Sequence, residues 1–326
     1  MLKWAIIFLS FPFFNYSQKN IFINLTPYFE TEPFVLTQNY SFINGDLVKF
    51  NYFNYYISNV EITHDGGQIS KFQNAVFHIT HENHTIYLGY LNIEQIEHLA
   101  FKVGVPEELN TQEGALAQDI STYPENHALS FQSPSMYWGW QSGYMHMITG
   151  GYSDQNSDDE VAEFEGLFEL HNLGNHNQQN VVINNVIQTN TADDLIDINI
   201  NCYVDRWVGD ISLANVGVLH GEFGLNQQIM ENIIPNAVFE QGDFADILVI
   251  IDDEFRLFHA DNTLTVFSFS DKNSIIKLFN ALGQEVFSKK INGKNVSIST
   301  IGYEPGIYTV LISQNGINIT KKILLF

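Results

Sequence analysis

Histidine is the residue type in this chain that is best suited to hold a transition metal. The sequence has 11 histidines, and imidazole is a good ligand for copper or zinc. The candidate metal ligands are His171, His78 and His146. Each is equally open to interpretation as a hydrogen-bonded structural residue, because no tight two-histidine spacing on one strand forces a metal site. His81 and His84 fall where a hairpin should turn, so we expect them to face solvent.

The segment 135–144 is the sharpest aromatic feature. It holds Trp138 and Trp140, two of the four tryptophans, and side chains two apart on a strand point to the same side. One interpretation is an aromatic core strand, and another is a site where an indole lies beside a metal or ligand. If both rings were exposed and coplanar, they would favour a carbohydrate-binding platform.

An acidic segment partly follows the spacing of a calcium-binding loop. Asp154, Asn156, Asp158 and Glu165 stand at the first, third, fifth and twelfth positions of such a loop. The glycine expected at its sharp turn is replaced by Asp159. The pattern therefore favours a solvated acidic loop, with calcium binding as the alternative.

Signatures of hydrolases and nucleotide-binding proteins are missing. The sequence has no Gly-x-Ser-x-Gly, no phosphate-binding glycine-rich loop with lysine, and no His-Glu-x-x-His. Neighbouring carboxylates such as Asp193 and Asp194 could serve a glycosidase, but adjacency in sequence does not make them face each other. Cys202, the single cysteine, shares the apolar face of an alternating segment, which predicts a buried small hydrophobe. We therefore predict a protein that is not an enzyme.

Charge divides the chain into two parts. Residues 18–249 carry 5 Lys and Arg against 30 Asp and Glu, a net charge of −25, whereas residues 250–326 carry +1. So few cationic groups argue against nucleic acid and against anionic membrane surfaces. The change of composition predicts a domain boundary near residue 250.

The N-terminus has the pattern of a secretory signal peptide. Lys3 precedes an apolar run from Trp4 to Phe14, and the small residue Ser17 follows. The run is too short for a stable membrane anchor. We predict a signal peptide over 1–17 and no transmembrane span.

The remaining chain reads as short strands. Apolar and polar residues alternate, and Asn, Gly and Asp stand at the breaks. Asp65-Gly66-Gly67 predicts a hairpin turn, Asn226 to Ile234 predicts a helix ended by Pro235, and Asn92 to His98 predicts a short helix. The fold class is all-β, a β-sandwich domain over 18–249 followed by a smaller Ig-like β-sandwich over 250–326.

The C-terminal part resembles a known export module. Residues 276–286, Pro305-Gly306 with the strand that follows, and Lys321-Lys322-Ile323 are similar, in order and position, to the C-terminal sorting domain of the type IX secretion (Por) system. The Asn-Pro often found near the start of such domains is absent. The resemblance implies recognition by the outer-membrane type IX secretion machinery and a secreted or cell-surface location.

The large domain resembles the MbnP-like family of secreted copper-binding proteins. The segments that carry the resemblance are 55–60, 103–105, 136–144 and 168–174. It implies copper bound by histidine, with His171 best placed and His78 and His146 as weaker candidates. It further implies a tryptophan, Trp138 or Trp140, that a dihaem partner enzyme can oxidise to kynurenine. We expect a secreted copper-binding protein for metal acquisition or handling; the alternative is a surface binding or structural module, carbohydrate-binding through the tryptophans.

Overall fold

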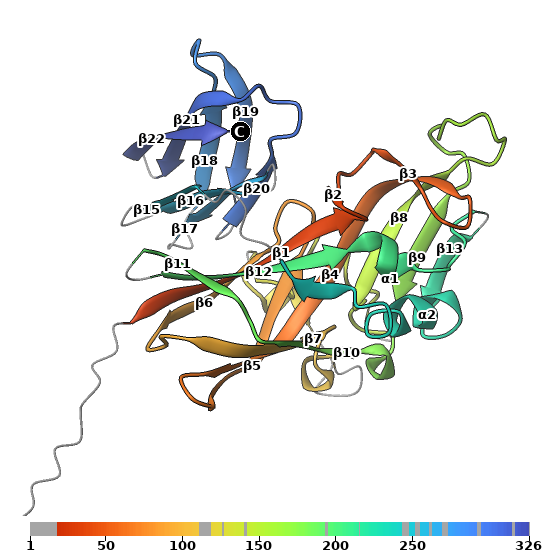
Figure 1. Cartoon of the computed structure of the whole chain (residues 1–326). Coiled ribbons are helices and arrows are strands. Elements are labelled where there is room, and N and C mark those ends of the chain that lie inside the picture. Colours follow the sequence, from red (N-terminus) through yellow and green to blue (C-terminus); the bar gives the residue numbers. More distant parts are fainter. Residues whose placement is uncertain are drawn as a thin grey trace, which may run out of the picture.

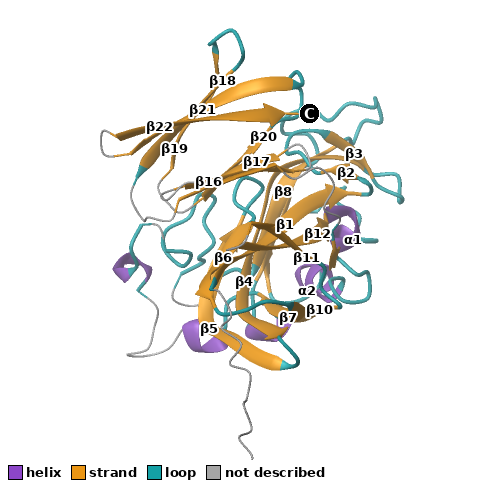
Figure 2. Cartoon of the chain, turned by 60° about the vertical axis from the view of Figure 1, so that its left-hand side comes forward, coloured by secondary structure: helices purple, strands orange, loops and turns teal. Residues whose placement is uncertain are grey.

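The structure is a computed structural model of the chain. It describes residues 18–110, 119–125, 127–139, 142–192, 195–214, 216–242, 248–251, 255–260, 263–268, 273–291, 295–314 and 317–325. The predicted signal peptide, Trp140 and the pair Asp193 and Asp194 lie outside these residues. The described part is nearly all β, as the alternating sequence predicts (Figures 1 and 2).

One sheet of the large domain is built around a parallel pair. Strand β1 runs beside β12, so that Ile21, Ile23 and Leu25 lie next to Ile196, Ile198 and Ile200. The order is β11-β12-β1-β2, with β6 beside β1 and β14 beside β12. The strands are β1 (Lys19–Phe29), β2 (Glu32–Pro33), β6 (Thr85–Leu91), β11 (Gln188–Ala192), β12 (Leu195–Tyr203) and β14 (Phe239–Gln241).

The second sheet is centred on the long strand β4. Its order is β10-β7-β4-β8-β9-β13, and β3 and β5 also pair with β4. The strands are β3 (Asn39–Ser41), β4 (Leu47–His64), β5 (Gln68–Ile79), β7 (Ile96–Val103), β8 (Met147–Ser153), β9 (Phe168–Asn172), β10 (Gln179–Asn184) and β13 (Gly217–Gly221). The turn Asp65-Gly66-Gly67 joins β4 to β5 with positive φ at all three residues, which confirms the predicted hairpin.

Apolar faces of the two sheets share the main core. Phe50, Phe53 and Tyr55 of β4 meet the isoleucines of β1 and β12 there. Helices α1 (Val204–Val208) and α2 (Leu225–Glu231) add Trp207, Ile229 and Met230 to the same core. Cys202 is buried among them, and burial raises the pKa of its thiol to about 12, so it packs as the predicted small hydrophobe.

A layer of irregular chain covers the outer face of the second sheet. Between β7 and β8, the described residues (104–110, 119–125, 127–139 and 142–146) contain the 3₁₀ turns η1 (Glu107–Leu109) and η3 (Ile120–Thr122); η4 (Asn175–Asn177) follows β9. The layer forms its own apolar cluster on the outer face of β4, β8 and the end of β9, with members Tyr56, Val105, Ile120, Leu129, Met136, Tyr144, Met145, Ile148 and Leu173. This layer holds Met136, Tyr137 and Tyr144 of the aromatic segment against the outer face of this sheet.

The C-terminal strands form a second sandwich, drawn in blue in Figure 1. Two four-stranded sheets, β15-β16-β17-β20 and β19-β18-β21-β22, share one core. The strands are β15 (Leu248–Ile251), β16 (Phe255–Ala260), β17 (Thr263–Ser268), β18 (Ser274–Phe279), β19 (Glu285–Ile291), β20 (Asn295–Ser299), β21 (Gly306–Gln314) and β22 (Ile317–Leu325). Since β15 pairs with β16, this unit already includes Leu248.

The two helix predictions have opposite outcomes. Helix α2 confirms the one expected from Asn226 onward. The helix expected over Asn92 to His98 is wrong, because these residues form a bend that leads into β7. Ile93 and Ile96 are both buried. Their three-residue spacing, which suggested a helix, arises because both side chains point inward on either side of the bend. Among the described residues, no helix is both long and apolar enough to span a membrane.

Candidate metal centre

Two histidines meet where β9 and β13 run side by side. The strands are parallel, and the register places His220 beside His171. Along β9 the residues Phe168, Leu170 and Asn172 point into the core, so His171 points to the outer face. Side chains of register partners stand on the same face of a sheet, and the two imidazoles therefore face each other.

Their ring nitrogens are within hydrogen-bond distance. Nδ1 of His171 and Nδ1 of His220 are 2.7 Å apart, and the ring centroids are 4.4 Å apart. Such a contact between neutral rings needs one donor and one acceptor, because each neutral imidazole carries one N–H. A single proton thus lies between two nitrogens that could both act as metal ligands.

Tyr52 and Glu169 fix the orientation of His171. The Tyr52 hydroxyl of β4 is 3.0 Å from Nε2 of His171, and a Glu169 carboxylate oxygen is 3.9 Å from the same nitrogen. Burial, the charge of Glu169 and a hydrogen bond to its carboxylate raise the pKa of Tyr52. A hydroxyl that donates to Glu169 accepts from Nε2–H of His171. This tautomer leaves the lone pair of Nδ1 directed at His220.

The His171 ring stays neutral well below physiological pH. Burial, reinforced by the neighbouring His220, lowers its pKa to about 4. Metal ions bind the neutral imidazole. His171 is therefore in the ligand-competent form across the neutral range.

The indole of Trp138 covers the His220 ring. The two rings are stacked with centroids 4.0 Å apart and an interplanar angle of 26°. Trp138 sits in a tight turn. Its backbone N–H donates to the Gly143 carbonyl, and the Gly143 backbone N–H donates to the Gly139 carbonyl. The indole is 50% exposed, so one face lies on the histidine and the remainder is open to solvent.

Comparison with known proteins gives the large domain a family. Residues 18–228 match the family model MbnP. The chain belongs to the MbnP family. No curated protein matches the sequence.

The C-terminal unit and the solved structures add two findings. Residues 260–325 match the secretion system C-terminal sorting domain, so the protein is secreted and carries a cell-surface sorting signal. MbnP from Methylosinus trichosporium is similar at 11% identity and a TM-score of 0.42, over 64% of this chain and 83% of that one. A DUF3244-family protein from Bacteroides vulgatus with an immunoglobulin-like β-sandwich fold is similar at 16% identity and a TM-score of 0.23, over 25% of this chain and 100% of that one.

The other two histidines singled out in the sequence stand elsewhere in the MbnP domain. His146 is fully buried, and both of its ring nitrogens are used: Nδ1 accepts from the Val105 N–H at 3.1 Å, and Nε2 lies 3.1 Å from the Gly174 carbonyl, to which it donates. His78 packs against Tyr56 at a centroid distance of 5.4 Å. Burial lowers the pKa of each to about 4. Neither is the partner of His171, since that place is taken by His220.

The acidic loop uses its carboxylates on its own backbone. Asp154 accepts the N–H groups of Ser157 and Asp159, and Glu165 accepts those of Gln155, Asn156 and Ala162. Asn156 and Asp158 each cap the residue two positions on. Within the described residues, no group of three or more His, Cys, Asp and Glu side chains is arranged to hold a metal. Calcium binding at this loop stays a prediction.

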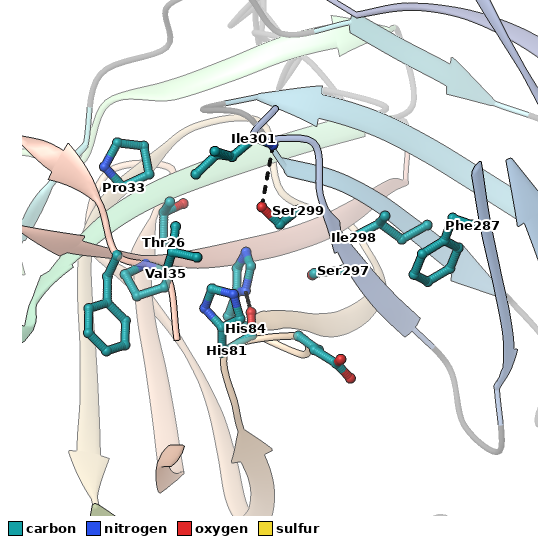
Figure 3. Close-up of a pocket in the computed structure, with 13 residues that line it drawn as sticks. Thr26, Pro33, Val35, His81, His84, Phe287, Ser297, Ile298, Ser299 and Ile301 are labelled. Carbon is teal, nitrogen blue, oxygen red and sulfur yellow. Dashed lines mark hydrogen bonds between the residues drawn. The ribbon is translucent and has the colours of Figure 1, made fainter. Parts of the chain in front are cut away.

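His81 and His84 are not solvent-facing as expected. The turn between β5 and β6 folds back on β1, where the Leu25 N–H donates to the His84 carbonyl at 2.8 Å. Burial lowers the pKa of both rings to about 4. They line a cavity of about 220 Å³ together with Thr26 and, from the sorting domain, Ser299 (Figure 3).

Sequence reasoning missed His220 and Tyr52. The signal for His220 was weak: it lies in Val218-Leu219-His220-Gly221, a short alternating segment that places it on the same side as Val218. Its pairing with β9 joins residues 49 positions apart. Tyr52 lies in an aromatic stretch in which nearly every residue could belong to a core.

Proposed function

We propose that this MbnP-family protein is a secreted copper-binding protein in which His171 and His220 hold the ion as cargo, without turnover. The observation that carries the proposal is the 2.7 Å separation of their Nδ1 atoms. Nitrogen ligands bind such ions at about 2.0–2.1 Å, as for zinc. Two nitrogens this close can therefore reach one ion once the rings separate to admit it, and the ion would then take the place of the proton.

The small number of ligands favours copper over competing divalent ions. In the described part of the chain, no further His, Cys, Asp or Glu completes a set of three around this pair. For a given set of nitrogen ligands, affinity rises along the first-row divalent metals to a maximum at Cu²⁺. A site with few protein ligands thus retains copper more readily than zinc or nickel, in agreement with the copper binding that the family resemblance implies.

Trp138 supports this assignment, because one face of its indole lies on the His220 ring. The same contact would bring the indole beside the proposed ion. Because Trp138 is half-exposed, we further propose it, ahead of Trp140, as the side chain that a dihaem partner enzyme would oxidise.

Metal stoichiometry of the secreted chain tests the proposal. Protein spanning residues 18–326 is titrated with Cu(I) and with Cu(II), desalted, and analysed for copper by mass spectrometry. We expect about one copper per chain, lost in His171→Ala and in His220→Ala. His176→Ala is the matched control: this exposed histidine stacks on Phe223 and lies outside the pair. Copper retained by both pair variants would refute the proposed site.

A further inference from the structure

The end of the β4–β5 hairpin holds a serine, a histidine and an aspartate in one hydrogen-bonded row. Nε2 of His64 is 3.0 Å from Oγ of Ser70, and Nδ1 of the same ring is 3.0 Å from Oδ2 of Asp65. Strand register brings them together: His64 pairs with Gln68 and Ile62 with Ser70, so His64 and Ser70 share a face. The row lies apart from the histidine pair of the proposed copper site.

Backbone donors anchor the aspartate. Oδ1 of Asp65 accepts the Gln95 N–H at 2.8 Å, and the Glu94 N–H lies 3.2 Å from Oδ1 and 3.1 Å from Oδ2. Burial alone would raise the pKa of Asp65, but the hydrogen bonds from His64 and from the backbone of Gln95 and Glu94 outweigh it and lower the pKa. The side chain is therefore an ionised carboxylate at neutral pH.

An ionised carboxylate determines where the histidine carries its proton. Asp65 can only accept, so Nδ1 of His64 must be the N–H that donates to it. The lone pair of Nε2 then faces Ser70, whose hydroxyl donates to it. A nucleophile that is bonded to a base, with the base oriented by a third group, is the arrangement that activates serine in acyl transfer.

The surroundings indicate which molecules could reach the serine. Ser70 is partly exposed, whereas His64 is buried. The adjoining turn contains Gly66 and Gly67, which are exposed and add no side chain to the approach. Glu97 accepts the Gly66 N–H at 2.6 Å, and its carboxylate keeps the approach negative, which disfavours anionic substrates.

We propose that Ser70, His64 and Asp65 form a nucleophilic site that cleaves small uncharged or cationic carboxylic esters. Oγ of Ser70 attacks the acyl carbon while its proton passes to Nε2 of His64, and the ester C–O bond breaks as His64 returns that proton to the leaving alcohol. Water then attacks the acyl carbon of the acyl-serine while His64 accepts a proton from it. The bond between the acyl carbon and Oγ breaks, His64 returns the proton to Oγ of Ser70, and the carboxylic acid leaves with no change of oxidation state.

Covalent labelling of the metal-free secreted chain tests this site. The protein, treated with a chelator, reacts with an uncharged fluorophosphonate, and peptide mass spectrometry locates the adduct. We expect labelling of Ser70 about 10²- to 10⁴-fold faster than that of the exposed Ser121, the range that a positioned base contributes. His64→Gln and Asp65→Asn should remove most of this advantage, and Ser70→Ala all of it.

Labelling of urea-unfolded wild-type protein is the control for variants that fail to fold. In urea the advantage of Ser70 over Ser121 should disappear, because it depends on the folded hydrogen-bond row. Equal labelling of the two serines in the folded wild type would overturn the proposal, as would full labelling in folded His64→Gln. Because copper is absent throughout, neither result bears on the proposed copper site.

Discussion

Replacing Tyr52 with phenylalanine isolates the contribution of one hydroxyl to copper affinity. The substitution keeps the ring that packs beside His171 and removes only the oxygen 3.0 Å from Nε2. Loss of the group that orients a ligating histidine typically weakens metal binding by about 10- to 100-fold. In free energy this is about 1.4–2.7 kcal/mol.

The structure places the expected loss at the lower end of that range. The Glu169 carboxylate is 3.9 Å from Nε2 when Tyr52 is present. In Tyr52→Phe it can move closer and accept the same N–H. We therefore expect about a 10-fold loss for Tyr52→Phe and about 100-fold for the double variant with Glu169→Met, which leaves Nε2 without either acceptor.

Competition with a chromophoric Cu(I) chelator at neutral pH measures the affinity. Tyr87→Phe is the matched control, because its hydroxyl also bonds a side chain, Asn20, but on the other sheet. Unchanged affinity in Tyr52→Phe, or a loss equal to that of Tyr87→Phe, would refute the idea that Tyr52 and Glu169 orient His171.

Three further predictions concern the surroundings of the site. Gly104→Ala should destabilise the fold by about 1–3 kcal/mol more than Gly67→Ala in urea unfolding, because a Cβ at Gly104 would lie 3.1 Å from the His146 ring whereas one at Gly67 meets nothing. Burial lowers the pKa of His146 from 6.5 to about 4 in the folded state. This contributes roughly 3 kcal/mol to the free energy of unfolding, which should be present above pH 6.5 and lost as the pH falls to 4. In urea unfolding, the free energy of unfolding of His146→Gln should fall less between pH 7 and pH 5 than that of the wild type. Trp138→Ala should speed copper transfer to a chelator several-fold, since it uncovers the His220 ring, whereas Trp138→Phe should remain near wild type by stopped flow.

Local pattern was sufficient to predict the strands but not their register. Alternation in Ile196 to Cys202 correctly predicted a strand with Cys202 turned inward. It carries no information on which strand lies alongside, because period 2 is the same for parallel and antiparallel neighbours. The parallel pairing of β12 with β1 joins residues 175 positions apart, and only the folded core decides it.

Only one histidine of the candidate site could be predicted, because the sequence pattern does not give the strand register that brings the second one beside it. His171 stood in a segment that resembles a family motif, so it could be singled out without knowledge of the fold. His220 becomes a ligand candidate through its register with His171. His146 was a weaker candidate in sequence, and in the fold Val105 and Gly174 occupy both of its ring nitrogens. Hydrogen-bond saturation is a tertiary property, and it separates a structural histidine from an available one.

The two histidines of the pair differ in a way that suits an ion that must be loaded and released. Tyr52 and Glu169 orient His171 through its Nε2 atom. By contrast, His220 is exposed on the outer strand β13 under a half-exposed indole. Structural metal sites are closed by four protein ligands; here one ligand is fixed and the other faces solvent. The net charge of −25 over residues 18–249 raises the local concentration of cations around this open side. For the proposed function, such asymmetry favours exchange of copper at the cell surface over permanent retention.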